Sequence, residues 1–302
     1  MAFADRDPAT IESVLQDLIH HFDYVSELGF QVHCWSEVWH LQSPSGREVH
    51  EAVYANEAID RDLRTLFAIK LGRLPYWDKR TDEIGESEGI RISTTSFPLA
   101  PTAARAAQLY LEDRACCLVT SSIFGRSEWT DVVILPSGLP SKVFFLDDST
   151  LRAKFWREVA LIENFTSAQL AEIAGWAFPR LRFHVDVWGQ TSRMEGSFIN
   201  LRDPLVNNLG GLNDFAPEVW ADNHNAFDIQ VRMAALASVD CSLESSNTRK
   251  NVKAMRERDV QFDGATVRCE WHAKLEPHRN RIHFDVRGDR VLIGLFASHL
   301  TT

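Results

Sequence analysis

The segment TVRCEWHAKLEPHRNRIHFDVRGDRVLIGLFA, residues 266–297, decides the predicted fold of the C-terminal region. Apolar and charged residues alternate in it, and the turn-forming sequences EPHRN and RGD divide it into three runs. Alternation with a period of two is typical of half-buried β-strands, and short polar connections are typical of hairpins. The segment therefore predicts an antiparallel meander of three strands, over residues 266–275, 281–286 and 290–297.

The same alternation divides the side chains of the first two strands between two faces of the sheet. The face expected to be core carries Val267, Cys269, Trp271, Ala273, Leu275, Ile282, Phe284 and Val286. The opposite face, expected to point to solvent, carries Arg268, Glu270, His272, Lys274, Arg281, His283, Asp285 and Arg287. One face of the predicted sheet is thus apolar and the other almost wholly ionisable.

The ionisable face has the groups that phosphodiester chemistry needs. His272, Lys274, Arg281 and His283 converge on it without any distortion of the backbone. Cleavage without a metal requires a proton acceptor, a proton donor and cations for the charge on phosphorus, and these residue types supply all three. The alternative is a solvated sheet face on which opposite charges pair across strands. Both interpretations fit the pattern.

A zinc site is a further alternative at this segment. Cys269 and His272 have the C-x-x-H spacing of zinc ligands. Their odd separation sends them to opposite faces of a regular strand, so that they meet only across a bulge. We therefore expect no metal and no cofactor.

Composition and charge limit the class of protein. The chain has 302 residues, of which 45% are hydrophobic and 25% charged, which is typical of a globular protein of two or three domains. It has no apolar run approaching the roughly 18 residues of a membrane span and no signal-peptide pattern at its start, so a cytoplasmic protein without membrane association is expected. Five cysteines without repeated spacing predict reduced thiols.

The net charge is distributed unevenly. From Glu244 onward there are eleven Lys and Arg against eight Asp and Glu, a net of +3, whereas residues 1–243 carry 21 against 34, a net of −13. The acidic part argues against non-specific nucleic-acid binding by the whole chain, but the basic C-terminal part can hold a phosphodiester.

The remainder of the chain predicts an α+β protein, with a mixed body of helices and strands before a C-terminal helix and the meander. Asp7-Pro8 begins a predicted helix that ends before Gly29, and Thr166 with Gln169 predicts a capping box. Further helices are expected over residues 59–74, 102–113, 149–164, 228–240 and 249–258, and a helix end at Gly210-Gly211. Strands are expected over 116–124, 131–136 and 180–188, with a hairpin around the turn 43–46 and a surface loop over 81–89. We predict three regions, 1–148, 149–240 and 241–302.

The C-terminal region resembles a known toxin class. The charged strand, a turn, the run RIHF at 281–284, another turn and the apolar run VLIGLFASHL at 291–300 resemble the C-terminal half of the RelE/HigB class of bacterial toxins, over about the last 55 residues. Members of that class are small α+β proteins that cut messenger RNA, commonly on the ribosome, without a metal. Two features differ: Ala297-Ser298-His299 replaces the lysine pair that usually follows the last strand, and the acidic first 240 residues have no counterpart.

The resemblance implies roles for particular residues. Lys274 and Arg281 would stabilise the phosphate, His283 would act as acid or base, and His299 would lie beside them near the final strand. Substrate contacts are expected from Arg268, His272, Arg279, Arg287, Arg249 and Lys253. The implied function is a metal-independent endoribonuclease of toxin-like or phage-defence type, whose first 240 residues regulate or sense. Its implied partners are RNA or the ribosome, and a regulatory or antitoxin protein.

Two other functions compete with this hypothesis. A binding module would use the same face to recognise RNA, the ribosome or a protein without any chemistry. A metal-dependent hydrolase would draw on Glu37 with His40, on Asp147-Asp148, or on Asp222 with His224, none of which has a recognisable metal spacing. Phosphate-binding loops, dinucleotide fingerprints and the serine nucleophile elbow are absent from the sequence.

Overall fold

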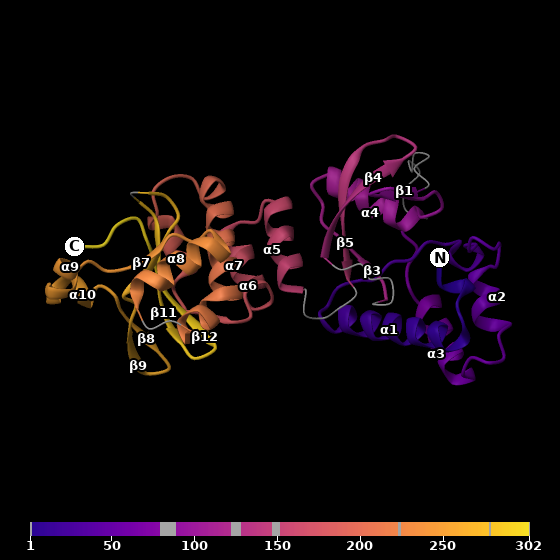
Figure 1. Cartoon of the computed structure of the whole chain (residues 1–302), viewed down its shortest axis with the longest axis horizontal. Coiled ribbons are helices and arrows are strands. Elements are labelled where there is room, and N and C mark those ends of the chain that lie inside the picture. Colours follow the sequence, from indigo (N-terminus) through magenta and orange to yellow (C-terminus); the bar gives the residue numbers. More distant parts are fainter. Residues whose placement is uncertain are drawn as a thin grey trace. The chain divides into compact units, whose positions relative to one another are not determined.

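The computed structural model describes residues 2–78, 89–121, 128–146, 152–222, 225–277 and 279–301. It is an α+β protein, as the sequence predicts, and divides into two compact units, Met1–Phe155 and Trp156–Thr302 (Figure 1). The predicted loop 81–89 lies almost wholly outside the described residues. No helix in the described part of the chain is both long and apolar enough to cross a bilayer.

Unit 1 combines a helical layer with a five-stranded sheet. Its helices are η1 (Ala2–Asp5), α1 (Pro8–Glu27), η2 (Val38–His40), α2 (Val49–Tyr54), α3 (Arg61–Gly72) and α4 (Pro101–Leu111). Its strands are β1 (Gly89–Ile92), β2 (Thr95–Phe97), β3 (Cys117–Val119), β4 (Glu128–Leu135) and β5 (Pro140–Leu146), in the order β2-β1-β4-β5-β3. Only β3 and β5 are parallel, and α4 packs its alanines against this sheet.

The start of α1 confirms the predicted cap. The side chain of Asp7 accepts a hydrogen bond from the backbone N of Thr10 at 3.0 Å, and Pro8 occupies the first helical position. The predicted hairpin around the turn 43–46 is wrong, since the described residues there form a single isolated antiparallel bridge, between Gln42 and Glu48. The chain after Glu48 becomes α2 instead, because Glu48 and Glu51 form a reciprocal capping box.

Unit 2 is built around a second five-stranded sheet. Its helices are α5 (Arg152–Ile162), which begins at the end of unit 1, α6 (Ser167–Ala177), η6 (Trp188–Arg193), α7 (Phe198–Asp222), α8 (Ala226–Ala237), α9 (Ser246–Lys250) and α10 (Val252–Arg256). Its strands are β6 (Leu181–Phe183), β7 (Cys241–Leu243), β8 (Asp259–Phe262), β9 (Ala265–Arg268), β10 (Trp271–Lys274), β11 (Arg281–Arg287) and β12 (Arg290–Ala297). The sheet order is β6-β12-β11-β10-β7, and β8 and β9 form a separate hairpin.

The predicted meander is present in β10, β11 and β12, which pair antiparallel in sequence order. The first predicted strand, however, is two strands. At Cys269 the backbone N donates to the carbonyl of Arg258, and the carbonyl of Glu270 accepts from the N of Glu244. The chain therefore changes partner there, and β9 pairs with β8 while β10 pairs with β7 and β11.

Both faces of this sheet are covered, which corrects the prediction of a solvent-facing side. On one face Trp220 of α7 packs against the rings of Trp271 and Phe284, with centroids 4.8 and 5.7 Å away. On the other face the β8–β9 hairpin packs against β12 through the cluster of Val260, Phe262, Val267, Cys269 and Leu292.

Two corrections concern the region before residue 240. The predicted strand 180–188 shortens to β6 (Leu181–Phe183), and Val185, within the predicted strand, is 86% exposed. Gly210 and Gly211 lie inside α7 rather than at a helix end. A Cβ at Gly211 would come within 2.6 Å of Val239 Cγ2, so close packing favours glycine there, whereas a Cβ at Gly210 would lie 2.9 Å from the flexible end of Arg157.

The domain boundaries differ in their outcome. The predicted boundary near 148 lies close to the division between the units. The predicted boundary near 240 falls inside unit 2, because β6 pairs in parallel with β12 and α7 covers the sheet that continues after residue 240.

Candidate functional site

Four of the predicted site residues lie on one face of the sheet of unit 2. Lys274 pairs with Arg281 across β10 and β11, and His272 pairs with His283 in the same two strands. These four side chains therefore lie on the same face of the sheet, as the alternation predicts. Their environments are different, because the histidine end of the face is buried and the Lys274–Arg281 end reaches solvent.

The buried end corrects the prediction that both histidines face solvent. His283 is 0% exposed and His272 is 6% exposed. Glu244, which follows β7, and Arg258, which follows α10, lie in the same buried cluster and are 5% and 1% exposed. A side chain as enclosed as His283 cannot reach an RNA substrate, so the catalytic role implied for it does not fit this structure.

Glu244 is the centre of this cluster. Its Oε1 accepts a hydrogen bond from Nε of Arg258 at 2.7 Å. The same oxygen lies 3.4 Å from Nδ1 of His272 and 3.8 Å from Nδ1 of His283. Ser242 completes the arrangement, because its Oγ lies 3.1 Å from Nε2 of His272.

The histidine nitrogens of the cluster are incompletely satisfied. Nδ1 of His272 and both ring nitrogens of His283 are buried without a hydrogen-bond partner. Burial, followed by the electrostatic influence of the neighbouring His272, lowers the pKa of His283 to about 3, so its imidazole is neutral. Burial raises the pKa of Glu244, but its contacts with His272 and Arg258 outweigh this effect and lower it to about 2.

The exposed end of the face contains a cation, Arg281, that has no counterion among the residues the structure describes. Nζ of Lys274 lies 3.1 Å from both carboxylate oxygens of Asp240 and is neutralised there. Arg281 has no ion pair with any described carboxylate, and its Nε is buried without a hydrogen-bond partner. His299, two residues beyond Ala297, the strand partner of Arg281, is exposed and hydrogen-bonds only locally to the carbonyl of Leu300.

Three of the arginines predicted to bind substrate are neutralised by neighbouring acids. Arg268 lies on the separate β9 and pairs with Asp259, with hydrogen bonds of 2.7 and 3.1 Å. Arg279 pairs with Glu276, and Arg287 pairs with Asp285. These arginines are engaged within the protein, and Arg268 does not belong to the face that carries Lys274.

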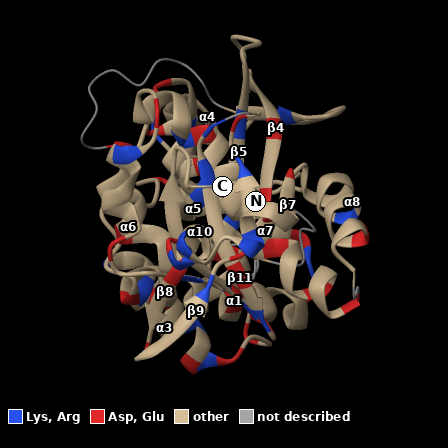
Figure 2. Cartoon of the chain, turned by 90° about the vertical axis from the view of Figure 1, so that its left-hand side faces the viewer, with Lys and Arg blue, Asp and Glu red and all other residues tan. Residues whose placement is uncertain are grey.

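The basic segment over α9 and α10 is different. Arg249 and Lys253, both predicted to bind substrate, are exposed and make no ion pair with any described residue. The same holds for Lys250 and Arg256. Figure 2 views the chain from the side on which α10 lies, with its Lys and Arg in blue (Figure 2). The hydroxyl of Thr301 donates to the carboxylate of Glu257, which ties the chain beyond β12 to the end of α10.

Three residues of the buried cluster were not predicted as site residues, namely Ser242, Glu244 and Arg258. Ser242 and Glu244 belong to a strand of only three residues and the position that follows it, too short for a period of two to be recognised. Arg258 follows a run of exposed basic residues and has no sequence feature that separates it from them. The pairing of β7 with β10 places Ser242 and Glu244 beside the histidines, and the backbone hydrogen bond from Cys269 N to the carbonyl of Arg258 brings Arg258 to the same place.

Where the structure describes their residues, the metal sites weighed from sequence are not formed. Cys269 packs in the apolar cluster of Val260 and Val267 rather than with His272. His40 contacts Glu48 at 3.2 Å, and Asp222 pairs with Arg232. Asp147, Asp148 and His224 lie outside the described residues. Within the described residues, the one group of three or more His, Cys, Asp or Glu able to converge on an ion is Glu244, His272 and His283.

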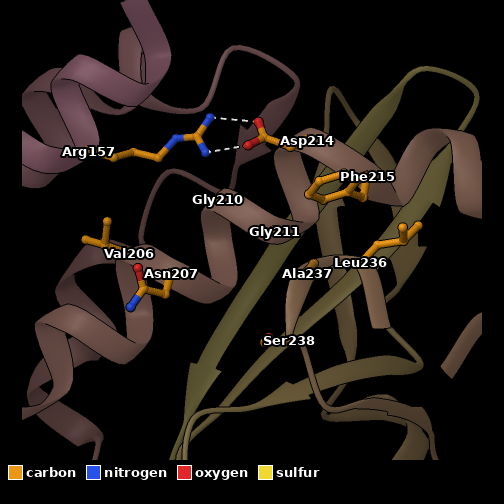
Figure 3. Close-up of a pocket in the computed structure, with 10 residues that line it drawn as sticks. All are labelled: Arg157, Val206, Asn207, Gly210, Gly211, Asp214, Phe215, Leu236, Ala237 and Ser238. Atoms are coloured by element: carbon orange, nitrogen blue, oxygen red, sulfur yellow. Dashed lines mark hydrogen bonds and ion pairs between the residues drawn. The ribbon is translucent and has the colours of Figure 1, made fainter. Parts of the chain in front are cut away.

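A pocket of about 280 Å³ lies elsewhere in unit 2, between the middle of α7 and the end of α8 (Figure 3). Its charged wall is a bidentate pair, in which Nη1 and Nη2 of Arg157 each donate to Asp214 at 2.7 Å. Nε of Arg157 donates to the carbonyl of Ala177 at 2.8 Å. Because this guanidinium is fully engaged, the pocket offers no free charge to a ligand, and it contains none of the residues predicted from sequence.

Comparison with protein-family models, with curated proteins and with solved structures gives no match to this chain.

Proposed function

We propose that unit 2 binds RNA, and that Arg281 is the principal phosphate ligand. The observation that carries the proposal is the half-buried guanidinium of Arg281, which has no counterion among the described residues. A partly buried cation without a partner is unfavourable, and a phosphate oxygen supplies both the charge and the acceptor that it lacks. Arginine also presents several N–H donors in a planar arrangement that matches a phosphate group.

Four exposed cations of α9 and α10, none of which forms a close ion pair with a described residue, support the same function. Lys253 and Arg256 interact electrostatically with the neighbouring Glu257 and Asp259 respectively. Exposed Lys and Arg outside close ion pairs can replace the counterions of a nucleic-acid backbone. The four are Arg249, Lys250, Lys253 and Arg256, and they belong to the part of the chain whose net charge is positive. The resemblance to RNA-cleaving toxins favours RNA as the nucleic acid that is bound. Single-stranded DNA of the same sequence serves as the comparison in the binding assay.

The binding experiment uses the full chain and a fluorescein-labelled single-stranded RNA, with affinity measured by anisotropy. Arg281→Ala should weaken binding about 10- to 100-fold, the worth of one or two charged hydrogen bonds. Arg287→Gln is the matched control on the same strand, because that arginine is already paired with Asp285. Equal losses in the two variants, or no RNA binding by the wild type, would contradict the proposal.

RNA cleavage is a second candidate function, and the position of His299 favours it. An exposed imidazole beyond β12, close in the sheet register to Arg281, is able to donate or accept a proton at a phosphate held by that arginine. His299→Ala should then reduce cleavage about 10²- to 10⁴-fold while RNA affinity stays within about twofold. Assays with and without ribosomes, in EDTA, separate cleavage by these side chains from metal-dependent contamination. Intact RNA under all these conditions would leave binding as the only activity.

A further inference from the structure

We propose that Glu244, His272 and His283 form a binding site for one divalent transition-metal ion of the zinc type. This inference is independent of RNA binding, and it departs from the sequence-based expectation of no metal. It concerns the buried end of the sheet face, whereas the proposed phosphate ligand Arg281 belongs to the exposed end.

The spacing of the three groups suits a small metal ion. Ligand atoms of the three residues all lie within 4.8 Å of one another, and the two histidine Nδ1 atoms lie 3.4 and 3.8 Å from Oε1 of Glu244. Tetrahedral ligands placed 2.0–2.1 Å from zinc are about 3.3 Å apart, so small side-chain movements bring all three to a bound ion.

The unsatisfied nitrogens point to a missing ligand. Nδ1 of His272 and Nδ1 of His283 are buried without a partner, although both approach the Glu244 carboxylate. In the tautomer in which Nε2 of His272 accepts from the Ser242 hydroxyl, Nδ1–H faces Glu244 at 3.4 Å, whereas in the other tautomer Nδ1 has a lone pair that a metal ion can take up. A metal ion satisfies all three groups at once.

Neighbouring side chains hold two of the three candidate ligands in place. Ser242 contacts the ring nitrogen of His272 that would not bind the metal, and Arg258 donates to Glu244. Partners of this kind fix the orientation of ligating histidines and carboxylates in metal sites. Arg258 already balances the charge of Glu244, so a bound dication needs a further anionic ligand. Hydroxide is such a ligand, and it would occupy the fourth coordination position that a His₂Glu site leaves open.

Two imidazoles and one carboxylate select the kind of ion. Imidazole suits zinc, iron, cobalt and nickel, whereas magnesium and calcium prefer all-oxygen sites. Co²⁺ is therefore a suitable spectroscopic probe, because its visible bands report coordination number directly. Mg²⁺ serves as the negative control.

The test measures metal uptake by the full chain after EDTA treatment and buffer exchange. One equivalent of Zn²⁺ per chain should bind in competition with a chromophoric chelator, and Co²⁺ should give bands of four- or five-coordinate metal. His283→Gln should weaken zinc binding by more than about 100-fold, because it removes a direct ligand. Ser242→Ala should weaken it by about 10-fold, because it removes only the contact that orients His272. His20→Ala, an exposed imidazole on α1, should change nothing.

The outcomes separate clearly. The proposal would be overturned if the wild type neither took up one equivalent of Zn²⁺ nor gave Co²⁺ bands. It would also be overturned if Ser242→Ala had the zinc affinity of the wild type and the same Co²⁺ spectrum. If His283→Gln does not fold, the wild-type stoichiometry and the Ser242 variant still decide. RNA affinity is measured separately, so that failure of either proposal is recognised independently of the other.

Discussion

Arg258 donates from Nε to Oε1 of Glu244 at 2.7 Å, although both side chains are almost completely buried. Arg258 also donates to the carbonyl of Ala254 at 2.6 Å, in the last turn of α10. The pair therefore links the end of α10 to the end of β7 through the interior of unit 2. Removing one member of such a pair leaves the other as an isolated buried charge, which is far more costly than loss of an exposed pair.

Glu244→Gln should lower the free energy of unfolding by about 3–5 kcal/mol, because the charge of Arg258 loses its partner. The measurement is urea unfolding in EDTA, which separates this effect from metal binding. Glu276→Gln, which removes the partner of the exposed Arg279, should cost at most about 1 kcal/mol. Equal losses in the two variants would show that burial does not determine the strength of the Arg258 pair.

The salt dependence of RNA binding should report the cations of α10. For single-stranded nucleic acid the slope of log affinity against log salt changes by about 0.7 for each phosphate contact. Lys253→Ala with Arg256→Ala should therefore reduce the slope by about 1.4. Glu276→Gln with Arg279→Gln removes a neutralised pair and should leave it unchanged. A slope that does not respond to the α10 variant would place the RNA contacts elsewhere.

Thiol reactivity should divide the five cysteines into two classes. Burial raises the pKa of Cys241 and of Cys269 to about 12, and that of Cys34 to about 11, so very little of each is thiolate at pH 8. The half-buried Cys116 and Cys117 should account for all rapid reaction with a thiol reagent. The double variant Cys116→Ser, Cys117→Ser should lose this phase, and the remaining thiols should react only in denaturant. Rapid labelling in the double variant would disagree with the enclosed positions of the other three.

Gly294→Ala should destabilise unit 2 by about 1–3 kcal/mol, the usual cost of overpacking. A Cβ at this position would lie 2.5 Å from Sγ of Cys269 and 3.0 Å from Cγ2 of Val260, where the β8–β9 hairpin crosses β12. A Cβ built on Gly189 would have no atom within 4 Å, so Gly189→Ala is the control. Its free energy of unfolding should differ from that of the wild type by less than about 0.5 kcal/mol. Thermal unfolding of both variants measures the difference.

Locally determined features were predictable from the sequence. The cap at Asp7, the capping box of Thr166 with Gln169 and the order of β10, β11 and β12 depend on residues close together in the chain, and the structure contains all of them. Short-range hydrogen bonds and hydrophobic periodicity are sufficient for such elements.

Features that depend on distant packing were not predictable in the same way. Period-two alternation correctly placed His272 and His283 on one face, but no local pattern indicates that the β8–β9 hairpin, Glu244 and Arg258 enclose that face. Likewise, Gly210 and Gly211 resemble a helix end until Arg157 and Val239 pack against them. For the candidate site, the sequence therefore indicated which residues share a face of the sheet but not how deeply their side chains are buried.

The parallel pairing of Val291 with Leu181 has a consequence for the order of events during synthesis. β12 lies inside the sheet, between β6 and β11, so this sheet is incomplete until residue 297 has left the ribosome. All strands of unit 1, in contrast, have been translated by residue 146. Vectorial translation thus allows unit 1 to fold early, whereas nascent unit 2 keeps two strand edges open to misassembly until its last strand arrives.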